Sequence, residues 1–177
     1  MKALSPPSPF FSANRGVLRD AARLGLVADL ACGRGRHAVA TAQDGLTTVA
    51  LDHNPDYLAD LGARATLETL PLHPLRWDLE TPLGLPFAPG RCGAILVFRF
   101  LYRPLAPALS ELLAAGGILL YETFTTGQLE LGVGPQNPAF LLEPGELPEL
   151  FPDLEIVSCE EGRHGDAVTA RLLARRA

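Results

Sequence analysis

Short apolar runs alternate with segments of helical periodicity along most of this chain. Residues 92–98 (CGAILVF) and 117–124 are almost continuously apolar, which is typical of strands covered on both faces, as in a parallel sheet. Three shorter runs, at 25–31, 47–52 and 72–77, have the length and composition of further buried strands. The pattern therefore predicts five strands in succession.

The segments beside these strands are predicted to be helices. The expected ranges are 12–24, 36–43, 55–65, 104–115 and 144–151. Ser12 is expected to cap the first helix and Gly45 to end the second. In the fourth, Leu105, Leu109 and Leu112 fall on one face. The alternation of strands and helices is interpreted as five βα units in series.

The two ends of the chain depart from this alternation. Residues 1–11 carry three prolines and are expected to form an irregular arm. Two last strands, 154–160 and 167–173, are expected to form a hairpin around a turn at 162–166. Five βα units and a hairpin predict one α/β domain over residues 1–177. We expect a Rossmann-like, doubly wound, mostly parallel sheet with the first strand at its centre and one antiparallel hairpin strand.

Composition narrows the class of protein. The chain has 177 residues, 47% of them hydrophobic and 20% charged, which suits one globular domain. Its net charge of −5 provides no overall basic field and so disfavours a nucleic acid partner. The three cysteines contain no CxxC pair, so we expect neither disulfides nor a metal site. No apolar stretch is long enough for a membrane span, and we expect a cytoplasmic monomer or dimer.

A glycine-rich turn follows the first predicted strand. Gly33-x-Gly35-x-x-Ala38 matches a nucleotide-binding turn, in which glycines allow close ligand approach at a helix start. Asp29, four residues before Gly33, would repel a pyrophosphate but suits a cationic amino group. Asp52 lies 19 residues after Gly33, close to the spacing of about 20 for a ribose-binding acid. These residues favour an adenosine with an amino-acid tail over a nicotinamide dinucleotide.

Five motifs in order resemble those of class I S-adenosylmethionine-dependent methyltransferases. They are DLACGRGRHA, ALDHN, RWDLE, AILVFRFLYRP and GGILLYETF, between about Val27 and Phe124. The stretch YETFTTGQ…NPAFLLEPGEL is similar to the tellurite-resistance-type subgroup. The resemblance implies the class I methyltransferase fold, S-adenosylmethionine as the cofactor and methyl transfer as the reaction.

The resemblance also implies a cofactor site. Its residues would be Asp29, Ala31, Cys32, Gly33, Gly35, Arg36, Asp52, His53, Asp78, Leu79 and Phe98. By likeness, Asp29 and Gly33 surround the methionine amino group, Gly35 lets the backbone approach, Arg36 meets the carboxylate, and Asp52 binds the ribose hydroxyls. His53 would flank the adenine, Asp78 and Leu79 would bind its edge, and Phe98 would lie near the sulfonium. Trp77 is either a core residue or part of the ligand platform.

Candidate catalytic residues lie where the fourth and fifth predicted strands end. They are Glu122, Tyr102 and Arg99. Glu122 is either a base that orients the acceptor or the partner of an arginine. Arg99 and Arg103 either bind an anionic acceptor or bridge to Glu122 or Glu111. The acceptor is expected to be a small molecule, either a soft nucleophile or an anionic metabolite, attacked in line.

Several departures and alternatives remain. The sequence Phe98-Arg99-Phe100 differs from the motif of amino-group DNA methyltransferases, which disfavours base methylation. Tyr102 stands where the subgroup favours His, and Gly134 and Gln136 stand where it has basic residues. The alternatives are a methyltransferase acting on tRNA or protein, a non-catalytic S-adenosylmethionine-binding module and, more remotely, a nicotinamide-dependent oxidoreductase.

The long connection 125–143 (TTGQLELGVGPQNPAFLLE) is predicted to be a lid. It is rich in turn residues, yet it carries too much apolar surface for a solvated loop. We expect it to roof the acceptor site beside Arg99 and Tyr102, together with the arm at Ser5–Phe11.

Overall fold

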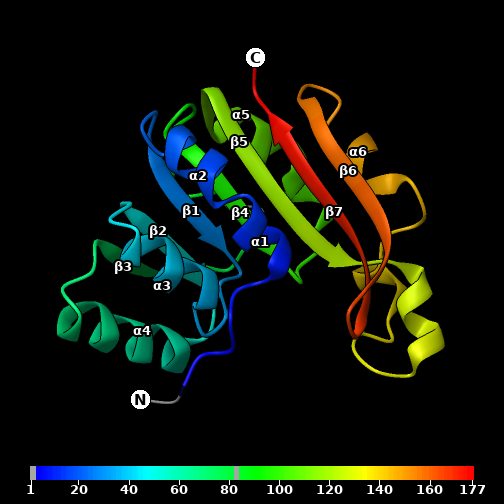
Figure 1. Ribbon diagram of the computed structural model, residues 1–177, viewed down its shortest axis with the longest axis horizontal. Coiled ribbons are helices and arrows are strands. Elements are labelled where there is room, and N and C mark those ends of the chain that lie inside the picture. The colour runs from blue at the N-terminus through cyan, green and yellow to red at the C-terminus, as the bar shows by residue number, and fades with distance from the viewer. Residues whose placement is uncertain (1–2, 82–83) are drawn as a thin grey trace.

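A computed structural model describes residues 3–81 and 84–177 and contains a seven-stranded sheet in the order β3-β2-β1-β4-β5-β7-β6 (Figure 1). The strands are β1 (Leu26–Leu30), β2 (Thr48–Asp52), β3 (Leu72–Arg76), β4 (Cys92–Phe98), β5 (Leu113–Phe124), β6 (Glu155–His164) and β7 (Ala167–Arg175). Neighbouring strands from β3 to β5 pair in parallel, whereas β7 is antiparallel to both β5 and β6. The predicted α/β, doubly wound fold with one antiparallel hairpin strand is confirmed.

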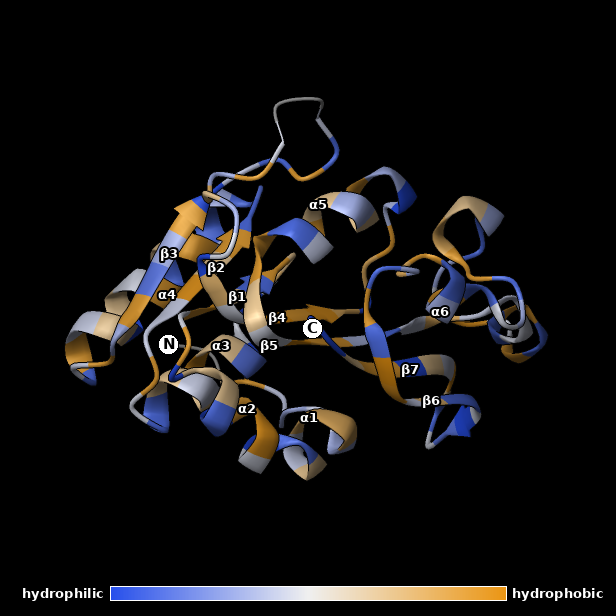
Figure 2. Cartoon of the chain, turned by 90° about the horizontal axis from the view of Figure 1, so that it is seen from above, coloured by the Kyte–Doolittle hydropathy of each residue, from blue (hydrophilic) through white to orange (hydrophobic). Residues whose placement is uncertain are grey.

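Helices cover both faces of the sheet. They are α1 (Pro9–Ala13), α2 (Arg15–Ala21), α3 (Arg36–Gln43), α4 (Pro55–Leu67), α5 (Ala106–Leu112) and α6 (Glu146–Glu149). Short 3-10 turns form η1 (Arg103–Leu105), η2 (Thr126–Leu131) and η3 (Pro138–Phe140). Figure 2 shows α1, α2 and α3 on one side of the sheet and α5 on the other. This is the layering expected of a doubly wound sheet.

Strand β4 shows why the sequence forms this sheet. All seven of its residues are buried, and their side chains alternate between the two faces. Leu96 and Phe98 pack in the same cluster as Phe11 and Leu18 from the α1–α2 side. Ile95 belongs to the cluster that contains the α5 leucines. The continuous apolar run was therefore the correct sign of a strand covered twice.

Some predicted boundaries were wrong. The helix expected at 12–24 is split into α1 and α2, and Ser8 rather than Ser12 caps the first of them. Residues 113–115, expected in a helix, begin β5 because Leu113 pairs with Cys92 of β4, ahead of a register shift in that pairing. No helix occurs among the described residues of the 77–91 connection, so the third unit is not βα. The hairpin strands are longer than predicted, leaving only residues 165–166 between them.

The middle strand of the sheet is β4, and not β1 as expected; β1 lies between β2 and β4. The chain reverses its direction of travel across the sheet between β1 and β4, which makes their carboxyl ends a topological switch point, where open α/β sheets bind ligands. The residues directly after the two strands, Ala31 and Arg99, have φ values of 52° and 59°. Such left-handed conformations are rare for residues other than glycine and cluster at functional sites.

Candidate functional site

Two cavities meet at the carboxyl end of β1. One has a volume of about 380 Å³ and the other about 350 Å³, and Ala31 lines both. The larger contains Asp29, Gly33 and Arg36, whereas the smaller contains Asp52 and the residues after β3. Together they form an elongated site that runs from α3 across β1 to β3.

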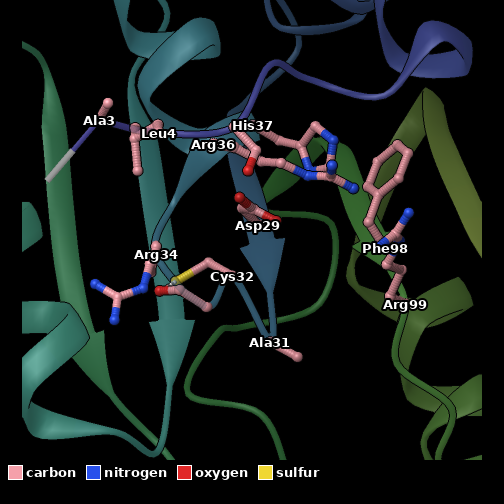
Figure 3. A pocket seen from close by; sticks show the side chains of 12 residues that line it. Ala3, Leu4, Asp29, Ala31, Cys32, Arg34, Arg36, His37, Phe98 and Arg99 are labelled. Carbon is pink, nitrogen blue, oxygen red and sulfur yellow. Dashed lines mark hydrogen bonds between the residues drawn. The ribbon is translucent and has the colours of Figure 1, made fainter. Parts of the chain in front are cut away.

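Asp29 is the most unusual group in the larger cavity. Its side chain lies beside the labelled Arg36 and Cys32, with the N-terminal arm passing nearby (Figure 3). The residue is only 1% exposed, and its Oδ2 has no hydrogen-bond partner among the described residues. Burial raises the pKa of this carboxyl to about 7, while the Ala38 backbone N–H and the Arg36 charge oppose the rise. A buried carboxylate oxygen without a donor calls for one from a ligand.

The two glycines of the turn have different structural roles. Gly33 lines the cavity with φ +56°, and a Cβ there would meet no atom within 4 Å. Gly35, the N-cap of α3, has φ +80°, and its Cβ would lie 2.6 Å from Leu61 Cδ1 of α4. Gly33 therefore leaves its open side to a ligand, and Gly35 is required for packing against α4.

Asp52 ends β2 in the smaller cavity. Its Oδ2 accepts a hydrogen bond from the Gly33 N–H at 2.8 Å, and its Oδ1 accepts one from the Asn54 N–H at 2.9 Å. These two bonds hold the carboxylate at the junction of the glycine turn with the adjoining cavity. Each oxygen retains lone-pair capacity for another donor.

Six further residues line the smaller cavity beside Asp52 and Ala31. His53, Asp78, Leu79, Glu80 and Phe100 line it together with Trp77. Leu79 is buried, whereas the His53 side chain is 82% exposed. Trp77 both packs against the main core and lines the cavity, so the two readings of this residue are compatible.

The N-terminal arm closes the larger cavity. Ala3, Leu4 and Ser5 line it, and the arm is fixed at the buried Ser8. The Ser8 N–H donates to His37 Nε2 at 3.1 Å, and the Ser8 hydroxyl donates to Glu122 Oε2 at 2.8 Å. The arm is thus tied to helix α3 and strand β5.

His37 acts as a buried acceptor in this arrangement. Its ring packs against Phe98, with the centroids 3.9 Å apart, and against Phe11 at 5.1 Å. Burial, with smaller effects of the Arg36 and Arg99 charges, lowers the pKa of His37 to about 3. The imidazole is therefore neutral near pH 7, and its accepting Nε2 places the proton on Nδ1. His37 is therefore a structural residue in the wall of the larger cavity.

Of the candidate catalytic residues, Arg99 has the most central position. It lines the larger cavity and two further ones. The first of these, about 450 Å³, is the proline cavity, bounded by Pro6–Pro9, Arg36, Arg99, Glu122, Arg171 and the β6–β7 turn. The second, about 270 Å³, is the lid cavity, bounded by Arg99, Phe100, Phe124, Pro135 and Phe140.

The structure places the other candidates differently. Glu122 forms an ion pair with Arg171, with Nε 3.0 Å from Oε2, and not with Arg99 or Arg103. Arg103 instead pairs with Glu146 and donates to the Leu141 carbonyl. Tyr102 packs against the main core and lies in none of the four cavities described above, because it precedes η1 on the α5 side.

Sequence reasoning missed the residues that reach the site from far along the chain. Arg171 faces Glu122 through the antiparallel register of β5 and β7. The arm at Ser5–Phe11 is expected near the acceptor site from the sequence, but the bonds of Ser8 to His37 and Glu122 and the place of Ala3 and Leu4 in the cavity wall are not. A strand-end Glu and a chain-terminal Ser-Pro stretch are visible in the sequence, but nothing local to them identifies their partners.

Within 3–81 and 84–177, no three His, Cys, Asp or Glu side chains are grouped as metal ligands. No helix in the same ranges combines the length and the apolar character needed to cross a membrane.

The arrangement of strands and helices is shared with solved structures. TehB from Haemophilus influenzae superposes with a TM-score of 0.71 at 22% identity, over 92% of this chain and 62% of TehB. An S-adenosylmethionine-dependent methyltransferase from Methanosarcina mazei gives 0.71 at 13% identity, over 97% of this chain and 99% of that one. The chain has the class I methyltransferase fold.

A third similar structure was solved with ligands bound. Geranyl diphosphate C-methyltransferase from Streptomyces coelicolor A3(2), solved with Mg²⁺, geranyl diphosphate and S-adenosyl-L-homocysteine, gives a TM-score of 0.68 at 14% identity. The superposition covers 94% of this chain and 80% of that one. No family model and no curated sequence matches the chain. At these identities the likeness establishes the fold, and function has to be argued from the site.

Proposed function

We propose that this protein is an S-adenosylmethionine-dependent methyltransferase that acts on a small molecule. The observation that carries the proposal is the buried Asp29 oxygen without a donor, beside the open face of Gly33. A cationic amino group at this position would satisfy the carboxylate, as the α-amino group of the cofactor's methionine part does. The solved relatives of this fold include methyltransferases, one of them in complex with S-adenosyl-L-homocysteine.

The two joined cavities fit this cofactor from end to end. In the larger, Asp29 and Gly33 would hold the amino group, Cys32 would form part of the wall, and Arg36 would meet the carboxylate. In the smaller, Asp52 would bind the ribose hydroxyls, while His53, Asp78 and Leu79 would surround the adenine. Ala31, between the cavities, would lie under the ribose, and Gly35 would act through packing with Leu61.

The bound cofactor supplies a methyl group already activated by the sulfonium charge. The protein then has to align an acceptor and exclude water. Phe98 and Arg99 end β4 where the larger cavity adjoins the proline and lid cavities, so the acceptor would meet the methyl group there. Its electron pair forms the new bond to carbon, and the carbon–sulfur electron pair returns to sulfur.

We assign Glu122 a positioning role. Its pairing with Arg171 and Ser8 fixes the arm over the cofactor cavity. The 125–143 segment would roof the acceptor, because Pro135 and Phe140 face Arg99 across the lid cavity. Tyr102 would support this region from the core side.

Calorimetry with S-adenosyl-L-homocysteine and NADH tests the cofactor assignment. We expect the former to bind and NADH to bind hardly at all. Asp52→Ala should weaken S-adenosyl-L-homocysteine by about 1.5–3 kcal/mol, the range for hydrogen bonds to a charged group. His73→Ala, an exposed change in β3, provides the control. Tighter binding of NADH would refute the proposal.

Turnover distinguishes an enzyme from a binding module. Release of S-adenosyl-L-homocysteine is measured across thiol, chalcogen, carboxylate, phenol and tRNA acceptors. We expect turnover with a small acceptor, and turnover with tRNA alone would exclude the small-molecule assignment.

A further inference from the structure

The proline cavity lies beside the cofactor site but is a separate space. It is enclosed by the N-terminal arm at Pro6–Pro9, by the carboxyl ends of β4 and β5, and by the β6–β7 turn. It shares two residues, Arg36 and Arg99, with the larger cofactor cavity. A molecule in the proline cavity would therefore adjoin the methionine end of a bound cofactor.

Two guanidinium groups face this cavity without a carboxylate partner. Among residues 3–81 and 84–177, neither Arg36 nor Arg99 has a carboxylate oxygen within ion-pair distance. The Arg36 Nη1 donates a long bond of 3.4 Å to the Pro6 carbonyl. The Arg99 Cζ lies 5.5 Å from the Phe124 ring centroid. Burial and the charge of Arg99 both lower the pKa of Arg36, so the two groups repel each other.

The acidic side chains near the cavity offset the charge of this pair only in part. The charges of Glu122 and Asp29 raise the pKa of Arg36, against the larger effects of burial and of Arg99. Glu122 is occupied by Arg171 and by the Ser8 hydroxyl, both at its Oε2. Asp166, on the β6–β7 turn, is exposed and makes no ion pair with either arginine. Unpaired positive charge is thus concentrated at one cavity of a chain whose net charge is −5.

The cofactor accounts for only one of the two arginines. On the proposed function, Arg36 at the start of α3 meets the methionine carboxylate. Arg99 then remains without an anion, at the point where the cofactor, proline and lid cavities adjoin. Its planar fork of donors matches a carboxylate in a bidentate manner, which an ammonium cannot do.

The dimensions and walls of the space favour an organic molecule over a bare oxyanion. The volume of about 450 Å³ lies in the range of cavities that hold small organic ligands. Pro6, Pro7 and Pro9 add apolar surface to the lining of the cavity. We propose, resting on the function above, that the proline cavity is an acceptor subsite in which Arg99 binds the carboxylate of a small organic acid.

Binding of benzoate to the full-length protein saturated with S-adenosyl-L-homocysteine tests this assignment. Benzamide serves as the uncharged isostere and inorganic phosphate as the bare oxyanion, each measured by ligand-observed NMR. We expect benzoate to bind at least tenfold more tightly than benzamide or phosphate. Arg99→Gln should weaken benzoate at least tenfold and leave benzamide unchanged, whereas Arg99→Lys should give an intermediate loss.

The control and the outcomes separate this inference from the proposed function. Arg23→Gln removes the same charge from a side chain that is 81% exposed, and it should leave benzoate binding unchanged. Equal binding of benzoate and benzamide, equal binding by Arg99→Gln, or tighter binding of phosphate would each overturn the carboxylate subsite. If S-adenosyl-L-homocysteine itself fails to bind the wild type, the proposed function fails, and the same titrations without it still decide whether the cavity takes a carboxylate.

Discussion

Replacement of Asp29 by Asn is expected to stabilise the free protein and to weaken cofactor binding. Asp29 is buried, its Oδ2 has no donor, and its pKa is raised from the ordinary value of 3.8 to about 7. The folded protein therefore keeps this proton up to about pH 7, whereas the unfolded chain releases it near pH 4. Between these values the unfolded state binds fewer protons, so the free energy of unfolding falls as the pH rises.

The magnitude follows from the shift. A change of about 3 units corresponds to about 4 kcal/mol at 1.36 kcal/mol per unit, which is an upper bound on the penalty above pH 7. Asn avoids the charge but keeps a buried polar group, so the variant should gain less than this bound at pH 8. At pH 5 the unfolded carboxyl is already ionised, so about 1.2 of these 3 units, or about 1.6 kcal/mol, should still separate the two proteins. The difference should disappear only below about pH 4, where Asp29 is protonated in both states.

Cofactor binding should favour the ionised form of Asp29, whereas folding favours the protonated form. An ammonium group favours the ionised carboxylate, so S-adenosyl-L-homocysteine should bind the wild type more weakly as the pH falls below 7. Binding at pH 6 should also release a proton from Asp29, visible by calorimetry in two buffers of different ionisation enthalpy. Asp29→Asn should bind weakly at every pH and release no such proton.

The assay combines urea unfolding of wild type and Asp29→Asn between pH 5 and pH 8 with these titrations. A stability difference independent of pH would show that Asp29 is not held protonated by burial. Tight, pH-independent binding of S-adenosyl-L-homocysteine by the variant would show that this carboxylate does not meet the amino group. Either result would refute the reasoning.

Three further perturbations test the packing and the lid. Gly35→Ala should lower the melting temperature, because this residue has φ +80° and its Cβ would lie 2.6 Å from an α4 side chain. Gly33→Ala, whose Cβ meets no atom within 4 Å, should lose less stability but should weaken the binding of S-adenosyl-L-homocysteine. Leu96→Asp should give no folded protein, because β4 is buried on both faces. The control Leu67→Asp, at a residue 72% exposed, should give a normal circular dichroism spectrum. A soluble Leu96→Asp variant with an unchanged melting temperature would contradict the position of β4 within the sheet. Deletion of residues 130–135 should spare S-adenosyl-L-homocysteine binding and remove turnover, and retained transfer to a small acceptor would rule out the lid.

The order of strands and helices was accessible from the sequence because it rests on short-range patterns. The apolar run at 92–98 and the glycine turn at 33–35 are encoded by neighbouring residues, and both occur in the structure as expected. The same local information left helix ends uncertain. Residues 113–115 have helical composition, but Leu113 pairs with Cys92 of β4 and the segment begins β5, so tertiary contact overrides propensity there.

Some residues of the candidate site could likewise be placed from the sequence, and others could not. Asp29 and Asp52 end adjacent parallel strands, so their place at the switch point follows from strand order alone. The partner of Glu122 does not, because Arg171 reaches it only through the antiparallel register of β5 and β7. Tyr102 is predicted beside Arg99 at the carboxyl end of the fourth strand, whereas in the structure it packs against the main core and lines none of the four cavities described.

By itself, the sequence determined the strand succession, the glycine turn, and the position of Asp29 and Asp52 at the carboxyl ends of the first two strands. Each of these depends on residues within a few positions or on strand order. Only the tertiary structure decided that the arm closes over Asp29 through Ser8 and that Arg99 borders three cavities. These features join segments more than 100 residues apart, as in the contact of Ser8 with Glu122 across 114 positions. Such contacts arise from sheet register and the docking of chain ends, which no local pattern of side chains encodes.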